Sequence, residues 1–95
     1  MVVGVATVDL YIHGVQSLKE KRGVVRRVVD RVRNRFSISV AEVDNLDLHQ
    51  KATIGMAIVT NDRRLADSTL NKALSFVEDM HLAEVVRADL EILNV

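Results

Sequence analysis

The side chains best suited to chemistry lie in the middle of this 95-residue chain, where Glu42, Asp44, Asp47 and His49 follow one another closely. Hard cations prefer carboxylate oxygens, so this cluster is a candidate metal site. Its spacing, however, matches neither an EF-hand loop nor a zinc motif. We therefore predict structural or charge-pairing roles for these residues, and no bound metal.

The three histidines, His13, His49 and His81, show no HExxH or other ligand spacing, and no serine or aspartate is placed to indicate a triad. The chain has no cysteine, which excludes thiolate nucleophiles and disulfides and is typical of a reducing compartment. No apolar run approaches the roughly 18 residues of a membrane span, and no signal peptide is evident. The sequence thus predicts no catalytic residue, no cofactor, no membrane association and a cytoplasmic location.

The most unusual stretch is the basic segment from Ser17 to Phe36, which holds eight cations and two anions, a local charge of +6. Because the net charge of the chain is zero, the remaining residues carry −6. Such asymmetry bears on partners, and clustered arginines can contact the phosphates of a nucleic acid. The candidate contacts to RNA or the ribosome are Arg22, Arg26, Arg27, Arg31, Arg33 and Arg35. A solvated helix face without a ligand is the alternative interpretation.

A helix must present these charges, and Ser17 with Glu20 encodes its start. In such a capping box the Ser17 hydroxyl accepts from the Glu20 amide, and the Glu20 carboxylate reaches back to the Ser17 amide. Apolar residues then recur at three- and four-residue steps, which defines a buried face. These residues are Leu18, Val25, Val28, Val29, Val32 and Phe36.

Three cations in the first turn, Lys19, Lys21 and Arg22, oppose the helix dipole, which disfavours positive charge there. Unfavourable positive charge at this position indicates that an acidic neighbour or an anionic ligand compensates for it. We expect a structural charge pair between one of these cations and an acidic residue, with Glu42 as the first candidate.

Hydrophobic patterns predict strand 2–12, helix 17–36, strand 37–43, loop 44–50, strand 53–60, a helix capped by Asn61 or Asp62 and ending near 80, and strand 86–92. In one domain of residues 1–95, this order indicates an α+β fold: a ferredoxin-like four-stranded antiparallel sheet with two helices on one face. The crossover rule favours strand order 4-1-3-2. Val86, Ala88, Leu90 and Ile92 should face the core, and Leu46 and Leu48 can fold back against it.

This topology also predicts a second basic cluster at the end of the domain. Arg33 and Arg35, late in the first helix, should approach Arg63 and Arg64 at the start of the second. The N-terminus of a helix favours anions through its free amides and its dipole. We therefore expect a phosphate or sulfate to bind there.

The sheet face without helices should offer one aromatic residue, Tyr11, beside the acidic residues Asp9, Asp89 and Glu91. RNA-recognition modules of this topology stack bases on aromatic side chains of that face, so a nucleic acid would here have to contact the basic helix instead. Val3 and Val5 on the same face favour an alternative function. In this alternative, the chain is a homodimeric or protein-interaction module, and another chain covers the face.

Three blocks of sequence carry a family resemblance: SLKEKR at 17–22, RFSISVAEV at 35–43 and AIVTND at 57–62. Together they resemble the YlxP-like family of small bacterial proteins, a domain of unknown function. The resemblance covers nearly the whole chain and implies a ferredoxin-like fold in a bacterial cytoplasmic protein. It also implies a gene often found among translation-initiation and ribosome-maturation genes. The family has no established catalytic residues, and Thr60 stands where relatives usually have serine.

A shorter stretch, Gly14-Val15-Gln16, resembles a fragment of the phosphate-binding loop of acylphosphatases, which share the predicted fold. Ser17 replaces the next glycine, however, and Lys21 stands where the catalytic arginine of that family would be. A shared fold does not transfer chemistry. An acylphosphatase-like enzyme is therefore the remote alternative.

Overall fold

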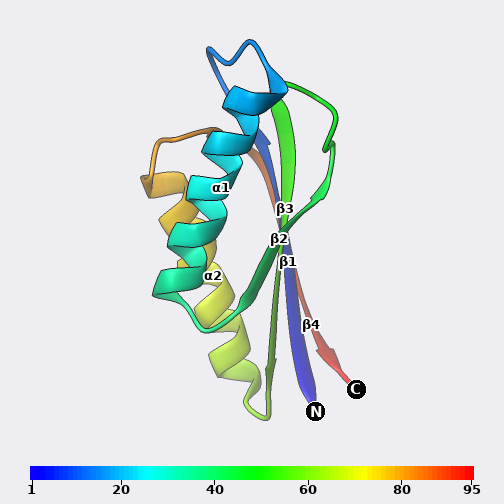
Figure 1. The fold of residues 1–95 in the computed structure, drawn as a ribbon. Coiled ribbons are helices and arrows are strands. Elements are labelled where there is room, and N and C mark those ends of the chain that lie inside the picture. The colour runs from blue at the N-terminus through cyan, green and yellow to red at the C-terminus, as the bar shows by residue number, and fades with distance from the viewer.

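The computed structural model describes all residues from Met1 to Val95. Its elements are β1 (Val2–Tyr11), α1 (Leu18–Arg35), β2 (Ser39–Asp44), β3 (Lys51–Thr60), α2 (Arg63–Asp79) and β4 (Glu84–Asn94). The sheet has the order β2-β3-β1-β4, and every neighbouring pair is antiparallel. Both helices lie on the same side of the sheet (Figure 1). The predicted ferredoxin-like fold and its strand order are confirmed.

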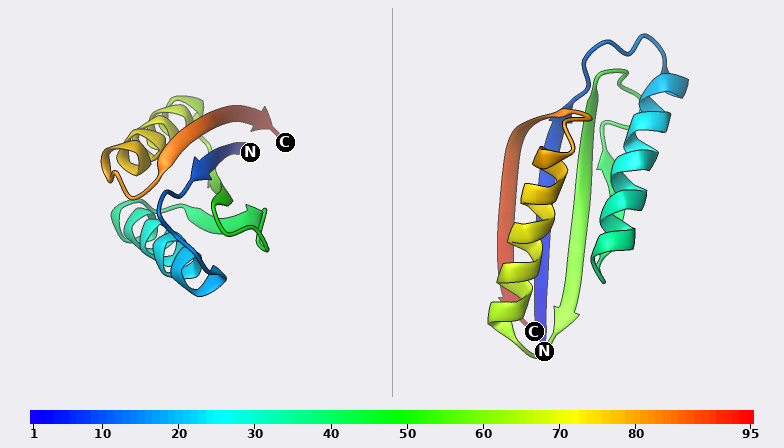
Figure 2. Two further views of the ribbon diagram at one scale, coloured as in Figure 1. Left: turned by 90° about the horizontal axis from the view of Figure 1, so that it is seen from above. Right: turned by 90° about the vertical axis from the view of Figure 1, so that its left-hand side faces the viewer.

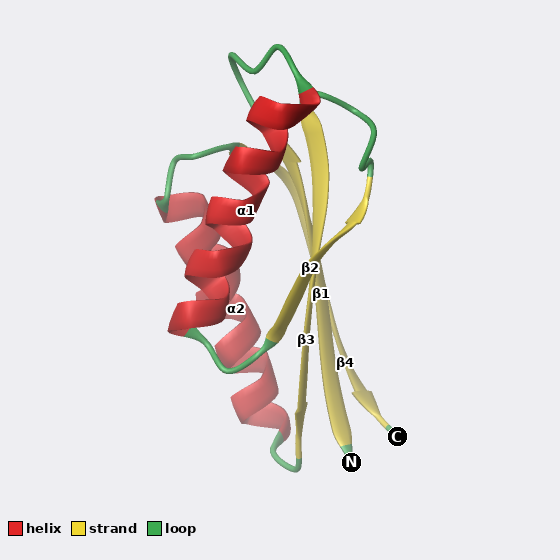
Figure 3. Ribbon diagram, viewed as in Figure 1, coloured by secondary structure: helices red, strands yellow, loops and turns green.

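The molecule has two layers and is elongated along the strands, with extents of 43 × 21 × 19 Å (Figure 2). The β1–α1 connection and the β2–β3 loop lie together at one end of the sheet, which we call the loop end (Figure 3). Both termini lie at the opposite end, the terminal end, where the amide of Val95 donates to the carbonyl of Met1 at 2.8 Å. Two loops are therefore available for binding at the loop end, and the two chain termini lie at the terminal end.

The core lies between the sheet and the two helices. Val28 and Val32 of α1, Leu70 of α2 and Val8 of β1 are each at most 1% exposed. Burial of each such side chain contributes about 1.5–3 kcal/mol, so the helical stripes predicted from the sequence hold the two layers together. The approach of α2 to the sheet depends on Gly4, because a Cβ atom there would lie 2.8 Å from Leu70 Cδ1.

The prediction for β4 is correct only in its second half. Leu90 and Ile92 pack against the core as expected, but Val85 does so in place of Val86, which is 62% exposed. The reason is a bulge, because the register between β1 and β4 shifts by one residue at this point. Ala88, in phase with Leu90, is exposed on this edge strand.

Candidate functional site

Helix α1 begins with one of the two predicted capping contacts. The Ser17 hydroxyl accepts from the amide of Glu20 at 3.2 Å. The Glu20 carboxylate accepts from the amide of Gln16 at 3.1 Å, one residue earlier than predicted. Glu20 therefore serves the start of the helix, and its charge lies next to the first turn.

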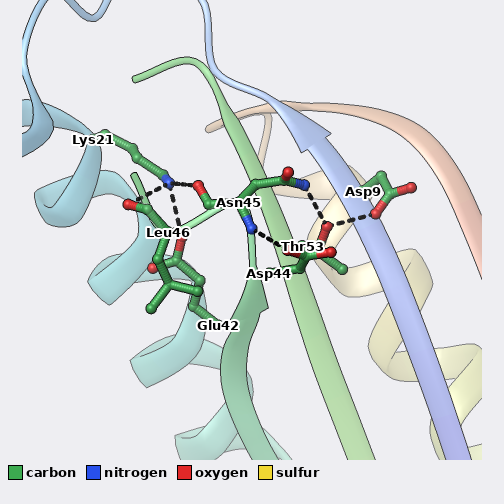
Figure 4. Close-up of polar contacts among 7 residues, drawn as sticks. All are labelled: Asp9, Lys21, Glu42, Asp44, Asn45, Leu46 and Thr53. Atoms are coloured by element: carbon green, nitrogen blue, oxygen red, sulfur yellow. Dashed lines mark hydrogen bonds and ion pairs between the residues drawn. The ribbon is translucent and has the colours of Figure 1, made fainter. Parts of the chain in front are cut away.

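Lys21 is the cation that the predicted charge pair involves (Figure 4). Its Nζ lies 2.8 Å from Glu42 Oε2, and its side chain is fully buried while that of Glu42 is 17% exposed. Nζ also donates to the carbonyls of Asn45, at 2.7 Å, and Leu46, at 3.3 Å. Glu42 Oε2 has no partner beyond this ion pair. The ammonium group thus has three acceptors, which compensate for the loss of its hydration.

This buried cation fixes the β2–β3 loop to α1. Because Lys21 draws the carbonyls of Asn45 and Leu46 inward, the leucine side chains of the loop point away from the core. Leu46 and Leu48 are 53% and 46% exposed, so the idea that they fold back onto the core is wrong. At the far end of the loop, the amide of Ile12 donates to the carbonyl of Gln50 at 2.8 Å. The loop is therefore held at both ends.

A chain of hydrogen bonds continues from this loop across the sheet (Figure 4). Asn45 Nδ2 donates to Thr53 Oγ1 at 3.0 Å, and Thr53 Oγ1 donates to Asp9 Oδ1 at 2.8 Å. The amide of Asn45 also donates to Asp44 Oδ1 at 2.7 Å, and Asn45 has a left-handed backbone with φ of 61°. This polar network joins α1 to the sheet face that carries no helix.

The other seven cations of α1 are all exposed, and they fall into two groups according to whether they contact another part of the chain. The ion pairs of the chain are His13–Glu84, Lys21–Glu42 and Arg87–Asp89. None of the seven has an acidic partner, and five of them also make no side-chain hydrogen bond or cation–π contact within the chain. We call these five the α1 basic surface: Lys19, Arg22, Arg26, Arg27 and Arg31. These five side chains are therefore free to contact a ligand.

The second group, Arg33 and Arg35, contacts the protein itself. Arg33 Nη2 donates to the carbonyl of Val40 in β2 at 2.6 Å. The guanidinium carbon of Arg35 lies 5.5 Å from the centroid of the Phe76 ring in α2, a cation–π geometry. Both arginines were predicted to contact a ligand, but the structure gives each a partner within the chain.

These two contacts orient the α1 basic surface. At 100° per residue, Lys19, Arg22 and Arg26 share a stripe with Arg33, and Arg27 and Arg31 share one with Arg35. The first stripe therefore faces the β2 side of the molecule, and the second faces the α2 side. The surface presents cations along both flanks of the helix.

The predicted cluster of Arg33 and Arg35 with Arg63 and Arg64 does not form. Arg35 lies against Phe76, which is thirteen residues beyond Arg63 in α2, or about 20 Å at 1.5 Å per residue. The reason is that α1 ends short of the edge of the sheet at which α2 begins, because the strand that follows α1, β2, begins opposite Ala57, three residues before the end of β3. Asp62, one of the two predicted caps, begins α2, and its Oδ1 accepts from the amides of Arg64 and Leu65.

Comparison with known proteins identifies the family. The model of the family described as Protein of unknown function (DUF503) matches residues 3–90. The chain belongs to the DUF503 family. The uncharacterized protein YlxP of Bacillus subtilis (strain 168) is 34% identical over 76 residues, which cover 80% of this chain and 83% of YlxP. The predicted membership of a YlxP-like family is therefore confirmed.

Solved structures share the fold of this DUF503 protein at low sequence identity. A mutant of SnoaB, a cofactor-independent oxygenase from Streptomyces nogalater, matches with a TM-score of 0.51 and 10% identity, covering 99% of this chain and 92% of SnoaB. At3g17210 from Arabidopsis thaliana matches with a TM-score of 0.51 and 13% identity, covering 98% and 94%. These matches support the fold alone.

The remaining candidates of the DUF503 chain lie apart from one another. His13 Nε2 contacts Glu84 Oε1 at 2.8 Å, while His49 and His81 are exposed. No group of three or more acidic or histidine side chains is arranged to hold a metal. Lys21, at the place of an acylphosphatase arginine, is bound to Glu42 and to the loop. No helix of the structure is long and apolar enough to cross a membrane.

The open sheet face, the face without helices, carries apolar side chains. Val59, Val43 and Leu93 are 67%, 54% and 38% exposed, and Val3 and Val5 are partly exposed. Among its few aromatic contacts, the Tyr11 ring meets the His13 ring edge-on with centroids 4.6 Å apart. This face therefore offers an apolar surface and no row of aromatic rings for base stacking.

Sequence reasoning missed three features of the site. Lys21 is three residues after Leu18 and four before Val25, so the helical repeat already places it on the buried stripe. The tie from Arg33 to Val40 and the network from Asn45 to Asp9 depend on contacts between separate elements. No local signal in the sequence indicates either.

Proposed function

We propose that this DUF503 protein is a non-catalytic, cytoplasmic binding module that contacts RNA, free or in the ribosome, through the α1 basic surface. The main supporting observation is that five exposed cations on one helix have neither an acidic partner nor another polar contact in the chain, although the chain contains as many acidic as basic residues. Only two of the 13 acidic residues, Glu20 and Asp30, lie on α1, so the helix keeps an excess of positive charge.

The form of the surface supports phosphate contacts. Cations along both flanks of a helix can meet the backbone of a nucleic acid, and such contacts provide affinity with little sequence preference. Base stacking would need aromatic platforms, and neither α1 nor the open sheet face carries a row of them. The translation-gene context that the family resemblance implies agrees with an RNA partner.

Salt dependence tests the proposal directly. The measurement is fluorescence anisotropy of labelled mixed-sequence single-stranded RNA, titrated with protein at several salt concentrations. If roughly four of the five cations contact phosphates, log K should fall against log salt with a slope of about −3, or about −0.7 per contact. The double variant Arg26→Gln/Arg27→Gln removes one cation from each flank and should make the slope shallower by about 1.4.

A matched control removes the same charge elsewhere. Arg63→Gln/Arg64→Gln also loses two arginines, but at the start of α2, about 20 Å from the end of α1. The proposal requires this variant to bind like the wild type. Equal losses in the two variants would mean that RNA responds to net charge alone, and no binding at low salt would exclude RNA as the partner.

The exposed apolar residues of the open sheet face favour a second candidate, a module that self-associates or binds a protein through this face. Monomers rarely expose large contiguous apolar patches. Sedimentation velocity decides whether the chain self-associates, and Val59→Lys, in the most exposed of these valines, should convert a dimer to a monomer. A wild-type monomer over a wide concentration range would exclude the homodimer.

A further inference from the structure

A pocket of about 250 Å³ lies where the β2–β3 loop overhangs the open sheet face. It is lined by groups from four segments, namely Asp9 and Tyr11 of β1, Lys51 of β3, Asn45 and Leu48 of the loop, and Val86 of β4. Pockets for drug-sized ligands measure about 300–1,000 Å³, so this one suits a smaller molecule.

The pocket is formed in advance, because polar contacts fix its walls. Lys21 holds the carbonyls of Asn45 and Leu46, and the Tyr11 hydroxyl donates to Gln50 Oε1 at 3.0 Å. The bulge in β4 turns Val86 out of the core, and Val86 then forms an apolar wall. Bulges of this kind often redirect a side chain at a binding site.

Two opposite charges in the pocket have no ionic partner in the chain. Asp9 Oδ1 accepts from Thr53, and no cation pairs with this carboxylate. Arg87 stands opposite Asp9 in the β1–β4 register but lies 2.8 Å from Asp89 instead. In the β1–β3 register Asp9 lies opposite Thr53, and Lys51 lies opposite Tyr11. Lys51 is therefore the diagonal neighbour of Asp9, and such neighbours typically have Cα atoms about 7–8 Å apart. One small molecule can meet both.

We propose that this pocket binds a small zwitterion with an aliphatic side chain, of the chemical class of the free α-amino acids. Its ammonium group bonds to Asp9, its carboxylate bonds to Lys51, and its side chain contacts Leu48 and Val86. Charge-assisted hydrogen bonds of this kind are the strong ones, and two of opposite sign fix the orientation of the ligand. This site is separate from the α1 basic surface.

Three probes test the assignment by ¹H–¹⁵N NMR titration of the full chain: L-leucine, L-leucinamide and isocaproate. Leucinamide lacks the carboxylate and isocaproate lacks the ammonium group, while both keep the aliphatic part. Leucine should give saturable shifts at the amides of Asp9, Asn45, Leu48 and Lys51, with a roughly millimolar dissociation constant, as so few ligand atoms allow. The two analogues should bind at least about tenfold more weakly.

Variants check the two charges separately. Asp9→Asn keeps an oxygen for the Thr53 hydroxyl and should remove the preference for leucine over isocaproate. Lys51→Gln should remove the preference for leucine over leucinamide. The matched controls Asp67→Asn and Lys72→Gln, on α2, should bind leucine like the wild type. The proposal is overturned if leucine moves no pocket amide, if the three probes bind equally well, or if the controls lose as much affinity as the pocket variants.

Discussion

Lys21 and Arg22 are neighbours in the chain, yet they occupy opposite environments. Lys21 is fully buried against Glu42 and two loop carbonyls, and Arg22 is exposed with no acidic partner. One residue turns the helix by 100°, which is enough to move a cation from the core stripe to the solvent side. Charge on this helix therefore has two uses: one cation holds the fold, and its neighbours are available to a ligand.

The largest effect that follows from this contrast is on stability. Lys21→Met should lower the free energy of unfolding by about 3–5 kcal/mol, because Glu42 and two loop carbonyls would lose their partner in a buried site. Arg22→Met, the same change one residue later, should alter it by less than about 0.5 kcal/mol. Urea denaturation of both variants, followed by circular dichroism, gives the two values.

A double variant shows whether the loss comes from the stranded charge. Lys21→Met/Glu42→Leu replaces the pair by apolar groups of similar size, and such replacements are often neutral or stabilising. It should therefore recover most of the stability lost in Lys21→Met. If the double variant is as unstable as the single one, the contacts of Lys21 with the loop carbonyls dominate, and the ion pair itself contributes little.

Regular periodicity explains which parts of this picture the sequence predicts. The fold follows from alternation and helical repeats, and the strand order follows from the crossover rule. The unfavourable charges of the first turn predict an ion pair of Glu42 with Lys19, Lys21 or Arg22, and the structure shows that Lys21 forms it. The helical repeat also places Lys21 on the buried face of α1, but lysine is usually exposed, so its residue type argues against burial. The bulge at Val86 and the position of the end of α1 along the sheet, which keeps Arg35 from Arg63, depend on strand lengths and registers that tertiary packing sets.

The next largest effect concerns Asn45, the loop residue that Lys21 holds. Asn45→Ala loses the hydrogen bond to Thr53. It also places alanine, which has no polar side chain to favour a left-handed backbone, at φ of 61°. Together the two losses should lower the free energy of unfolding by about 2 kcal/mol. Asn45→Gly loses the same bond but tolerates this backbone, so about half of that loss is expected. Equal losses in urea denaturation would mean that the left-handed conformation contributes nothing.

A smaller effect is expected at Arg33, which shares a helix with the α1 basic surface but donates to the carbonyl of Val40. Arg33→Gln should lower the free energy of unfolding by about 1 kcal/mol, the usual value of one hydrogen bond. Because its guanidinium group is held by β2, we expect RNA affinity and its salt slope to stay near the wild-type values. A steep loss of affinity would place Arg33 in the interface instead.

The smallest effect on stability, and the sharpest contrast with Arg33, is expected at Arg26. Its side chain lies on the same stripe of α1, seven residues earlier, but contacts no acidic group and no backbone carbonyl. Arg26→Gln should therefore change the free energy of unfolding by less than about 0.5 kcal/mol. If Arg26 contacts a phosphate, the same substitution makes the slope of log K against log salt shallower by about 0.7 for single-stranded RNA.

Measuring the free energy of unfolding and the salt slope on both variants gives a reciprocal pattern, in which Arg33→Gln changes stability and Arg26→Gln changes binding. If both variants keep the wild-type affinity and salt slope, the exposed arginines are only a solvated surface, and self-association through the open sheet face is then the leading function.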